Sequence, residues 1–215
     1  MTRVKICGIT RLEDAQHAIA CGAEMLGFNF YSKSPRYVAP EAVAKITVTL
    51  PSNIETIGVF VNEESTARVR EIASTAGITS VQLHGDETPE FCAALHDLHV
   101  IKAFRAGESF TSTEVAAYAD CRILLDAAAP AFGGSGTKFD WEIARAVRQQ
   151  VTSLILAGGL DADSIADAIA TVHPDAVDAC SLLECSPGIK DPNKVQAFIS
   201  AVHAERLRFA VRAKD

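Results

Sequence analysis

The 215-residue sequence has no long apolar run and no cluster of basic residues. No stretch reaches the roughly eighteen consecutive apolar residues of a membrane span, and the amino terminus lacks the apolar region and cleavage site of a signal peptide. The formal net charge of -7, without a Lys/Arg block, disfavours nucleic acid and anionic membranes as partners. We therefore expect a cytoplasmic protein without such partners, in which any anionic ligand is held by local basic groups or backbone amides.

The cysteines lack the spacings of metal sites. No two have CxxC spacing, and no histidines follow at zinc-finger spacing, so the sequence predicts no metal centre. In a chain of this size, scattered cysteines are typical of reduced, mostly buried thiols. The six are Cys7, Cys21, Cys92, Cys121, Cys180 and Cys185.

Short apolar runs typical of strands alternate along the chain with segments of helical spacing. In the segment 11–21, for example, Leu12, Ala15 and Ile19 share one helical face, and similar spacing recurs at 65–76, 163–172 and 193–209. The predicted strands are 4–7, 25–30, 55–61, 80–84, 100–105, 122–126, 153–157 and 176–180.

This alternation predicts a parallel sheet with right-handed crossovers. Eight strand–helix units in this length fit one α/β domain, residues 1–215, folded as a (β/α)8 TIM barrel with parallel strands. A doubly wound open sheet is the alternative. It favours a glycine-rich dinucleotide loop after the first strand, and the stretch CGIT at 7–10 is not one.

The carboxyl ends of the strands form the active face of such a barrel. Cys7 ends the first predicted strand and Asp126 ends the sixth, so a thiol and a carboxyl group meet at this face. A cysteine is a base only as its thiolate, and a carboxyl group at a barrel mouth is suited to proton transfer. The alternatives are a small buried hydrophobic residue for Cys7 and a helix cap for Asp126.

The ends of the seventh and eighth predicted strands indicate a phosphate site. Gly158 and Gly159 follow the seventh strand, and Ser181 follows the eighth at the start of a short predicted helix, 181–184. Glycines let backbone N–H groups approach an anion, and a helix amino terminus adds a positive dipole end. We therefore expect a phosphorylated metabolite as substrate, although a glycine pair alone also fits a tight turn.

Lys5 lies on the same inward face of the first strand as Cys7, because side chains alternate along a strand. A buried ammonium group needs a counter-charge, and Asp178 on the eighth strand, which closes the barrel against the first, is the expected partner. The pair is interpreted as structural, or as tuning Cys7. A Schiff-base role for Lys5 is the competing hypothesis.

Three further features stand near the predicted mouth. Arg36, in the loop after the second strand, suits a substrate carboxylate through bidentate hydrogen bonds, or else is a solvated surface arginine. His84 ends the fourth strand and is either a catalytic base or a polar core residue. The glycine-rich run at 133–136 is expected to form a lid or a substrate-contacting loop.

Several motifs occur in a specific order: KICGIT at 5–10, GFNFYSKSPRYV at 27–38, IGVFVN at 57–62, VQLHGDE at 81–87, LLDA at 124–127, GGSGTKFDW at 133–141, LAGGL at 156–160 and SPGIKD at 186–191. In these motifs the chain closely resembles the phosphoribosylanthranilate isomerase family of tryptophan biosynthesis, nearly from end to end. Other phosphate-binding barrels share only the paired glycines.

The resemblance implies an Amadori rearrangement of N-(5-phosphoribosyl)anthranilate to 1-(o-carboxyphenylamino)-1-deoxyribulose 5-phosphate, without metal or cofactor. It assigns Cys7 as the general base, Asp126 as the general acid and Arg36 as the contact to the anthranilate carboxylate. The backbone at the ends of the seventh and eighth strands would hold the phosphate. Gly8 is expected to leave space above the thiol for the sugar.

One segment departs from the family pattern, which reads close to VDVSSGVESSPG where this chain has VDACSLLECSPG at 177–188. Leu182 replaces the expected glycine, and its side chain is predicted to crowd the phosphate. Two alternatives therefore stay open: another sugar-phosphate isomerase or epimerase, and a catalytically silent barrel that binds a phosphorylated ligand. No helical face is apolar enough to demand a partner, so we expect a monomer.

Overall fold

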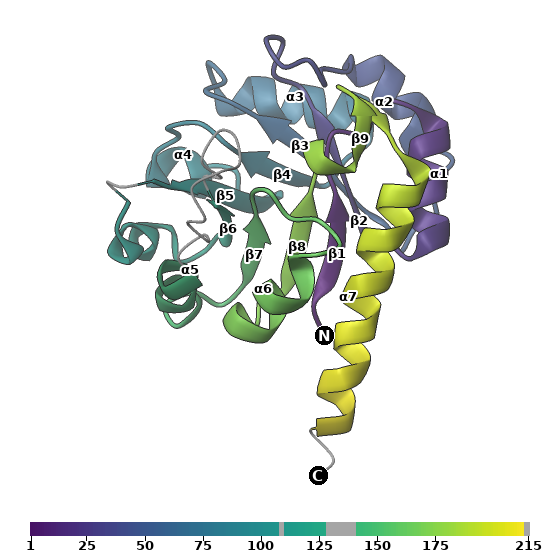
Figure 1. Cartoon of the computed structure of the whole chain (residues 1–215). Coiled ribbons are helices and arrows are strands. Elements are labelled where there is room, and N and C mark those ends of the chain that lie inside the picture. The colour runs from purple at the N-terminus through teal and green to yellow at the C-terminus, as the bar shows by residue number, and fades with distance from the viewer. Residues whose placement is uncertain (108–109, 128–140, 213–215) are drawn as a thin grey trace.

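A computed structural model describes residues 1–107, 110–127 and 141–212. In this part of the chain, eight parallel strands form a closed barrel in sequential order, with β8 paired to β1 (Figure 1). The predicted TIM barrel is confirmed, and each predicted strand is present within a few residues of its expected bounds. The strands are β1 Arg3–Ile6, β2 Met25–Asn29, β3 Glu55–Phe60, β4 Ser80–Leu83, β5 His99–Ala106, β6 Arg122–Ala127, β7 Leu154–Ala157 and β8 Ala176–Ala179.

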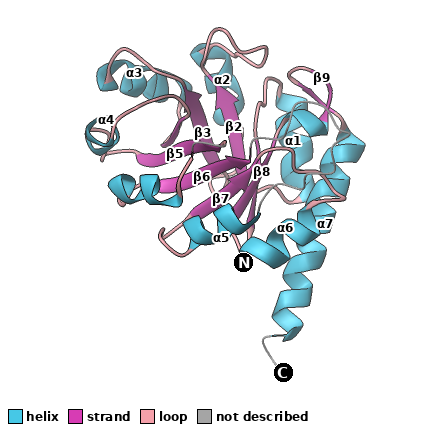
Figure 2. Cartoon of the chain, turned by 60° about the vertical axis from the view of Figure 1, so that its left-hand side comes forward, coloured by secondary structure: helices cyan, strands magenta, loops and turns pink. Residues whose placement is uncertain are grey.

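Helices surround the barrel on its outside (Figure 2). The predicted alternation fails after β5, where the connection is a 3-10 helix, η1, with one buried residue, Val115. One buried side chain gives too short an apolar face for a full amphipathic helix. The helices are α1 Leu12–Cys21, α2 Pro40–Thr47, α3 Thr66–Ala76, α4 Pro89–Ala93, η1 Ser112–Tyr118, α5 Trp141–Arg148, α6 Ile165–Val172, η2 Ser181–Leu183 and α7 Pro192–Arg212.

A small antiparallel hairpin interrupts the alternation between β8 and α7. Its strands are β9 Glu184–Ser186 and β10 Ile189–Lys190, which are too short to show a strand pattern in the sequence. The turn between them has Pro187 followed by Gly188, whose φ of 81° lies in the left-handed region. Proline followed by a left-handed glycine is the preferred composition of a type II turn. The hairpin carries Glu184 and Lys190 to the barrel mouth.

Two apolar layers stabilise the barrel. One lies between the strands and the surrounding helices, and the other fills the barrel interior. The inner layer gives way to a polar one near the carboxyl ends, where Lys5 is fully buried and Gln82 and Asp178 are nearly so. The inner apolar side chains are Met25, Ile57, Ile101, Ala103, Leu124, Ile155, Ala157 and Ala176.

Candidate active site

The carboxyl ends of the strands gather the titratable groups that the sequence predicts. Cys7 directly follows β1, Asp126 lies near the end of β6, and His84 directly follows β4. Strands β1 and β6 are separated by β7 and β8 around the barrel, so the thiol and the carboxyl group approach the mouth from different sides. The predicted loop at 133–136 lies outside the described residues.

Below the mouth, Lys5 pairs with Asp178 as expected. The Lys5 Nζ atom donates to Asp178 Oδ2 at 2.7 Å and to Gln82 Oε1 at 2.7 Å. Asp178 Oδ1 is buried and accepts no hydrogen bond from any described residue. Burial raises the pKa of Asp178 to about 7, against the attraction of the Lys5 ammonium group. Near neutral pH, the Asp178 carboxylate is therefore close to the midpoint of its protonation.

A chain of contacts connects this buried pair to Asp126. Lys5 only donates, so Gln82 must accept with Oε1 and donate with Nε2, which lies 2.9 Å from His84 Nδ1. The His84 Nδ1 atom must then accept, which places the ring proton on Nε2 when the imidazole is neutral. That Nε2 lies 3.5 Å from Asp126 Oδ2. His84 thus presents a donor to Asp126, a contact that its place in the sequence did not specify.

Cys7 is almost fully buried, with 9 % of its surface exposed. Its pKa lies well below the ordinary value, first because Cys180 hydrogen-bonds to it and then because Lys5, Lys190 and His84 attract the thiolate, while burial opposes ionisation. Gly27 on β2 makes room for the thiol, since a Cβ there would lie 2.7 Å from the Cys7 sulfur. These surroundings favour the thiolate, which is the form that acts as a base.

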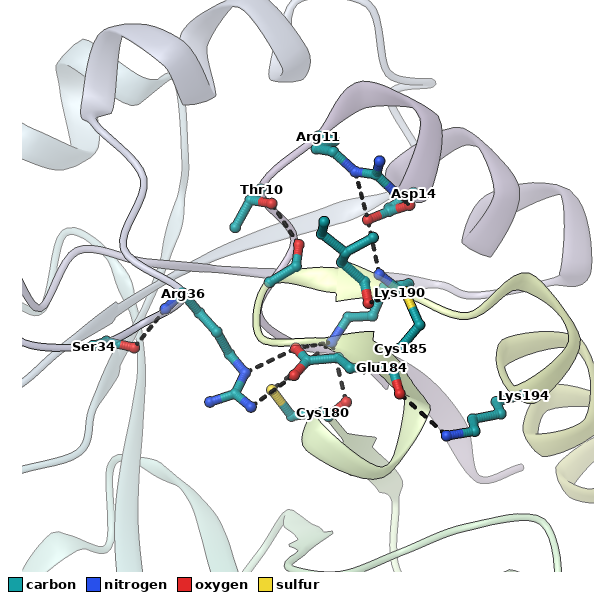
Figure 3. Close-up of polar contacts among 12 residues, drawn as sticks. Thr10, Arg11, Asp14, Ser34, Arg36, Cys180, Glu184, Cys185, Lys190 and Lys194 are labelled. Atoms are coloured by element: carbon teal, nitrogen blue, oxygen red, sulfur yellow. Dashed lines mark hydrogen bonds and ion pairs between the residues drawn. The ribbon is translucent and has the colours of Figure 1, made fainter.

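A charged cluster from β9, β10 and the loop after β2 lies at the mouth, next to Cys180 (Figure 3). Glu184 accepts two hydrogen bonds from Arg36, at 2.8 and 2.7 Å, and one from Lys190 at 3.0 Å. Burial opposes the Glu184 carboxylate, yet Arg36 and Lys190 hold its pKa below the ordinary value. Two cations around one carboxylate leave a net charge of about +1, which suits an anionic ligand.

Sequence reasoning identified Arg36 but missed Glu184 and Lys190, which fix its position. Both belong to the short hairpin, which also bonds to the first turn of the barrel through Thr10 Oγ1 and the Gly188 carbonyl at 2.6 Å. The signal for them was the family-like stretch SPGIKD at 186–191, which contains Lys190 and begins two residues after Glu184. The contribution of this stretch to the site is visible only in the structure, where the hairpin lies over the mouth.

The structure gives two reasons for glycine at position 8. Its φ of 73° lies in the left-handed region, and a Cβ there would lie 2.7 Å from Arg36 Cδ and 2.9 Å from the Cys180 sulfur. The space beside Gly8 therefore holds Arg36 and Cys180. Whether glycine at this position also leaves space above the Cys7 thiol for the sugar stays a prediction.

The predicted phosphate-binding residues lie at neighbouring strand ends. Gly158 and Gly159 follow β7 with φ values of 92° and 61°, and Ser181 opens η2 directly after β8 and Cys180. Leu182 in η2 is 44 % exposed, and it is absent from the residues with positive φ in the described part of the chain. The backbone here therefore has no conformational need for the glycine that the family carries.

Among the described residues, no three His, Cys, Asp or Glu side chains are grouped so that they would hold a metal ion. Over the same residues, no helix combines the length and apolar character needed to cross a bilayer.

Comparison with known proteins identifies close relatives. A family model described as N-(5'-phosphoribosyl)anthranilate (PRA) isomerase matches residues 4–201. An N-(5'-phosphoribosyl)anthranilate isomerase of Citrifermentans bemidjiense is 48% identical over 201 residues, covering 93% of this chain and 96% of that protein. Similar sequences therefore extend over nearly the whole length of both proteins.

Solved structures agree with the sequence comparison. A phosphoribosyl anthranilate isomerase from Thermotoga maritima superposes with a TM-score of 0.89 at 41% identity, covering 95% of this chain and all of that one. A phosphoribosyl anthranilate isomerase in complex with reduced 1-(o-carboxyphenylamino)-1-deoxyribulose 5-phosphate has a TM-score of 0.86 at 38% identity, with 95% and 100% coverage. Monomers made from the dimeric Thermotoga maritima enzyme give 0.84 at 38%, with 94% and 99% coverage.

Proposed function

Because this chain belongs to the N-(5'-phosphoribosyl)anthranilate isomerase family and is thus an isomerase of tryptophan biosynthesis, we propose that Cys7 and Asp126 are the base and the acid of its reaction. The reaction would be the Amadori rearrangement of N-(5-phosphoribosyl)anthranilate to 1-(o-carboxyphenylamino)-1-deoxyribulose 5-phosphate. The observation that carries this assignment is the placement of a thiol with a lowered pKa and a carboxyl group at separate strand ends of one barrel mouth.

Asp126 would act first. Its carboxyl group protonates the ribose ring oxygen, the C1–O bond breaks, and the anilino nitrogen forms an iminium with C1. The carboxylate that remains on Asp126 faces the Nε2 donor of His84 at 3.5 Å. A donor aimed at the site where negative charge develops lowers the energy of the transition state. His84 would therefore support ring opening through Asp126 without touching the sugar.

Cys7 would act second. The iminium acidifies the C2 proton, the Cys7 thiolate removes it, and the resulting enolamine relaxes to the ketone. Lys5, one layer below on β1, adds positive charge near the thiolate, and the hydrogen bond from Cys180 adds to it. One acid and one base complete the isomerisation, so the proposed reaction requires no metal ion and no cofactor.

The two anionic ends of the substrate would be held by groups that are already ordered. Backbone amides after β7 and at η2, around Gly158, Gly159 and Ser181, would bind the phosphate. Arg36 would bind the anthranilate carboxylate, with its guanidinium fixed by both oxygens of Glu184. A guanidinium that is already held in place loses little freedom when it binds a ligand. The net positive cluster attracts an anionic substrate locally, although the chain as a whole carries a charge of -7.

The test is turnover of the phosphoribosyl anthranilate by the purified protein and by two variants. Cys7→Ser and Asp126→Asn should each lower kcat by about 10²–10⁴-fold while the circular dichroism spectrum is unchanged. Cys21→Ser, which changes a half-buried thiol on α1 away from the mouth, is the control and should keep full activity. Near-normal kcat in either test variant would remove that residue from its role.

Complementation separates the proposal from its alternatives. The gene should restore growth without tryptophan to a bacterial strain that lacks this isomerase. Failure with abundant soluble protein, together with binding of a reduced product analogue, would favour a silent phosphate-binding barrel. Turnover of a different aldose phosphate, without the anthranilate compound, would favour another sugar-phosphate isomerase.

Location and assembly stay predictions. We propose a cytoplasmic monomer, based on the charge and on helical faces without large apolar stripes. A related enzyme from Thermotoga maritima is described as dimeric, so a dimer is the alternative to the proposed monomer. Light scattering of the purified chain would decide it, and a mass twice that of the chain would contradict the monomer.

A further inference from the structure

Gln82 lies inside the barrel, below the mouth. It belongs to β4, and its side chain is buried. Because side chains alternate along a strand, Gln82 points to the same inward side as His84, two residues later. Its partner Lys5, at 2.7 Å, comes from β1, which β2 and β3 separate from β4. The contact between Lys5 and Gln82 therefore crosses the barrel interior.

Lys5 fixes the orientation of the Gln82 amide. An ammonium group only donates, so the amide atom that lies 2.7 Å from Lys5 Nζ must be the oxygen. The reversed amide would place its NH2 group against the ammonium group, and neither buried group could turn to water instead. Asp178 holds the ammonium group through a second hydrogen bond at 2.7 Å. The amide of Gln82 thus keeps one orientation, with its NH2 group toward His84.

This orientation selects one tautomer of His84. The Gln82 Nε2 atom lies 2.9 Å from His84 Nδ1, a distance at which one atom donates and the other accepts. Since the amide nitrogen only donates, Nδ1 is the acceptor, and the proton of the neutral imidazole lies on Nε2. In the other tautomer, two N–H groups would face each other inside the barrel.

The tautomer matters because His84 Nε2 lies 3.5 Å from Asp126 Oδ2. With the proton on Nε2, a donor faces the carboxylate that remains once Asp126 has given up its proton, and it stabilises the negative charge there. With the proton on Nδ1, a nitrogen lone pair would face that charge and oppose its formation. The side chain of Gln82 bonds to Lys5 and to His84, so its effect on Asp126 would pass through His84.

We propose that Gln82 is a positioning residue for the reaction, whose amide holds His84 in the tautomer that presents an N–H group to Asp126. This inference rests on the proposed role of Asp126 as the acid. It also gives the buried Lys5 a second consequence, because its ammonium group orients the amide on which the tautomer depends. A glutamine that only filled the polar core and accepted from Lys5 would have no such effect on His84.

Nitrogen-15 NMR of the imidazole rings tests the tautomer without reference to activity. Two-bond proton–nitrogen spectra distinguish a protonated ring nitrogen from an unprotonated one, and comparison with His84→Ala assigns the His84 signals. At a pH where the ring is neutral, the parent should carry its proton on Nε2. In Gln82→Glu, a carboxylate oxygen replaces the amide nitrogen and only accepts, so Nδ1 should become protonated. A proton on Nδ1 in the parent, or an unchanged tautomer in Gln82→Glu, would overturn the inference.

A double-mutant cycle tests the path through His84. Gln82→Met keeps the length of the side chain but removes both hydrogen bonds, and it should lower kcat about three- to ten-fold with little change in KM. Gln196→Met, at an exposed position of α7, is the control for the same exchange and should keep full activity. In a His84→Ala background, Gln82→Met should cause no further loss of kcat, because the residue through which it acts is gone.

The same fold-loss of kcat in both backgrounds would overturn the inference, because Gln82 would then act on the fold or through Lys5 and not through His84. If Gln82→Met does not fold, the spectra of the parent and of Gln82→Glu still decide the question.

The outcomes for the two proposals are distinguishable. If Asp126→Asn keeps near-normal kcat, Asp126 is not the acid and the proposed function fails, whatever the tautomer of His84. If Asp126→Asn is inactive and Gln82→Glu leaves the His84 tautomer unchanged, Asp126 keeps its role and only the inference about Gln82 fails.

Discussion

Asp178→Asn should make this protein more stable near neutral pH, although it removes one member of a buried ion pair. Burial raises the folded-state pKa of Asp178 to about 7, whereas an aspartate in the unfolded chain titrates near ~3.9. A group whose pKa rises on folding contributes its full stability below the unfolded pKa and loses it as the pH rises through the folded pKa. The parent protein should therefore lose stability between about pH 4 and pH 7.

The size of this loss follows from the pKa difference. Three units correspond to about 4 kcal/mol, and because Lys5 and Asp178 titrate together we expect about 2–4 kcal/mol. Asparagine has the shape of a protonated aspartate and keeps an oxygen for the Lys5 Nζ atom. Asp178→Asn should therefore match the parent below about pH 4 and exceed its stability by about 2–4 kcal/mol near pH 7.

The assay is urea unfolding followed by circular dichroism across this pH range. Asp97→Asn is the control, because it breaks an exposed pair with Arg70 at 2.8 Å and should leave the stability nearly unchanged at every pH. A loss of about 3–5 kcal/mol in Asp178→Asn near neutral pH, the usual cost of breaking a buried pair, would refute the reasoning. It would show that Lys5 and Asp178 stabilise the fold as a full ion pair.

Three further outcomes are expected. His84→Ala should lower kcat about ten-fold with little change in KM, because the donor facing Asp126 is lost while the substrate contacts stay; a change confined to KM would contradict this. Leu182→Gly should lower KM for the phosphorylated substrate at constant kcat, and an unchanged or higher KM would show that the exposed leucine does not crowd the phosphate. Burial opposes ionisation of Glu55, yet Arg122, Ser80 and Arg3 hold its pKa at about 2. Its stabilisation is therefore complete above about pH 4.3 and is lost as the pH falls toward 2, so urea unfolding of Glu55→Gln should show a cost of about 1–2 kcal/mol at neutral pH and none at the acid end.

Much of the fold was predictable because its signals are local. Each barrel strand is a short apolar run, and left-handed glycines, Gly22 and Gly77, end α1 and α3 as glycine commonly does after a helix. The hairpin of β9 and β10 was missed because its strands of three and two residues are shorter than any periodic signal. The 3-10 helix η1 was missed because helical composition does not distinguish it from an α-helix.

The candidate site was likewise predictable only where its signals are local. Cys7, Asp126 and the pairing of Lys5 with Asp178 follow from strand ends and strand order, which a parallel barrel fixes. The contact between Glu184 and Arg36 joins residues 148 positions apart through a hairpin that has no sequence period. Such a contact depends on where a loop folds back, and single-sequence patterns contain no information about that.

Two acidic side chains show how stability and chemistry divide along the barrel axis. Glu55, at the amino end, has its two oxygens satisfied by Arg3, Arg122 and Ser80, so ionisation stabilises the fold. Asp178, toward the mouth, has one donor and one unpartnered oxygen, so ionisation costs stability. The free energy lost at Asp178 keeps the Lys5 ammonium group buried beneath the reactive thiol, whose pKa it lowers. Stabilising substitutions should therefore be found mainly at the mouth, where they reduce turnover, whereas substitutions of Glu55 at the amino end should reduce stability and leave turnover unchanged.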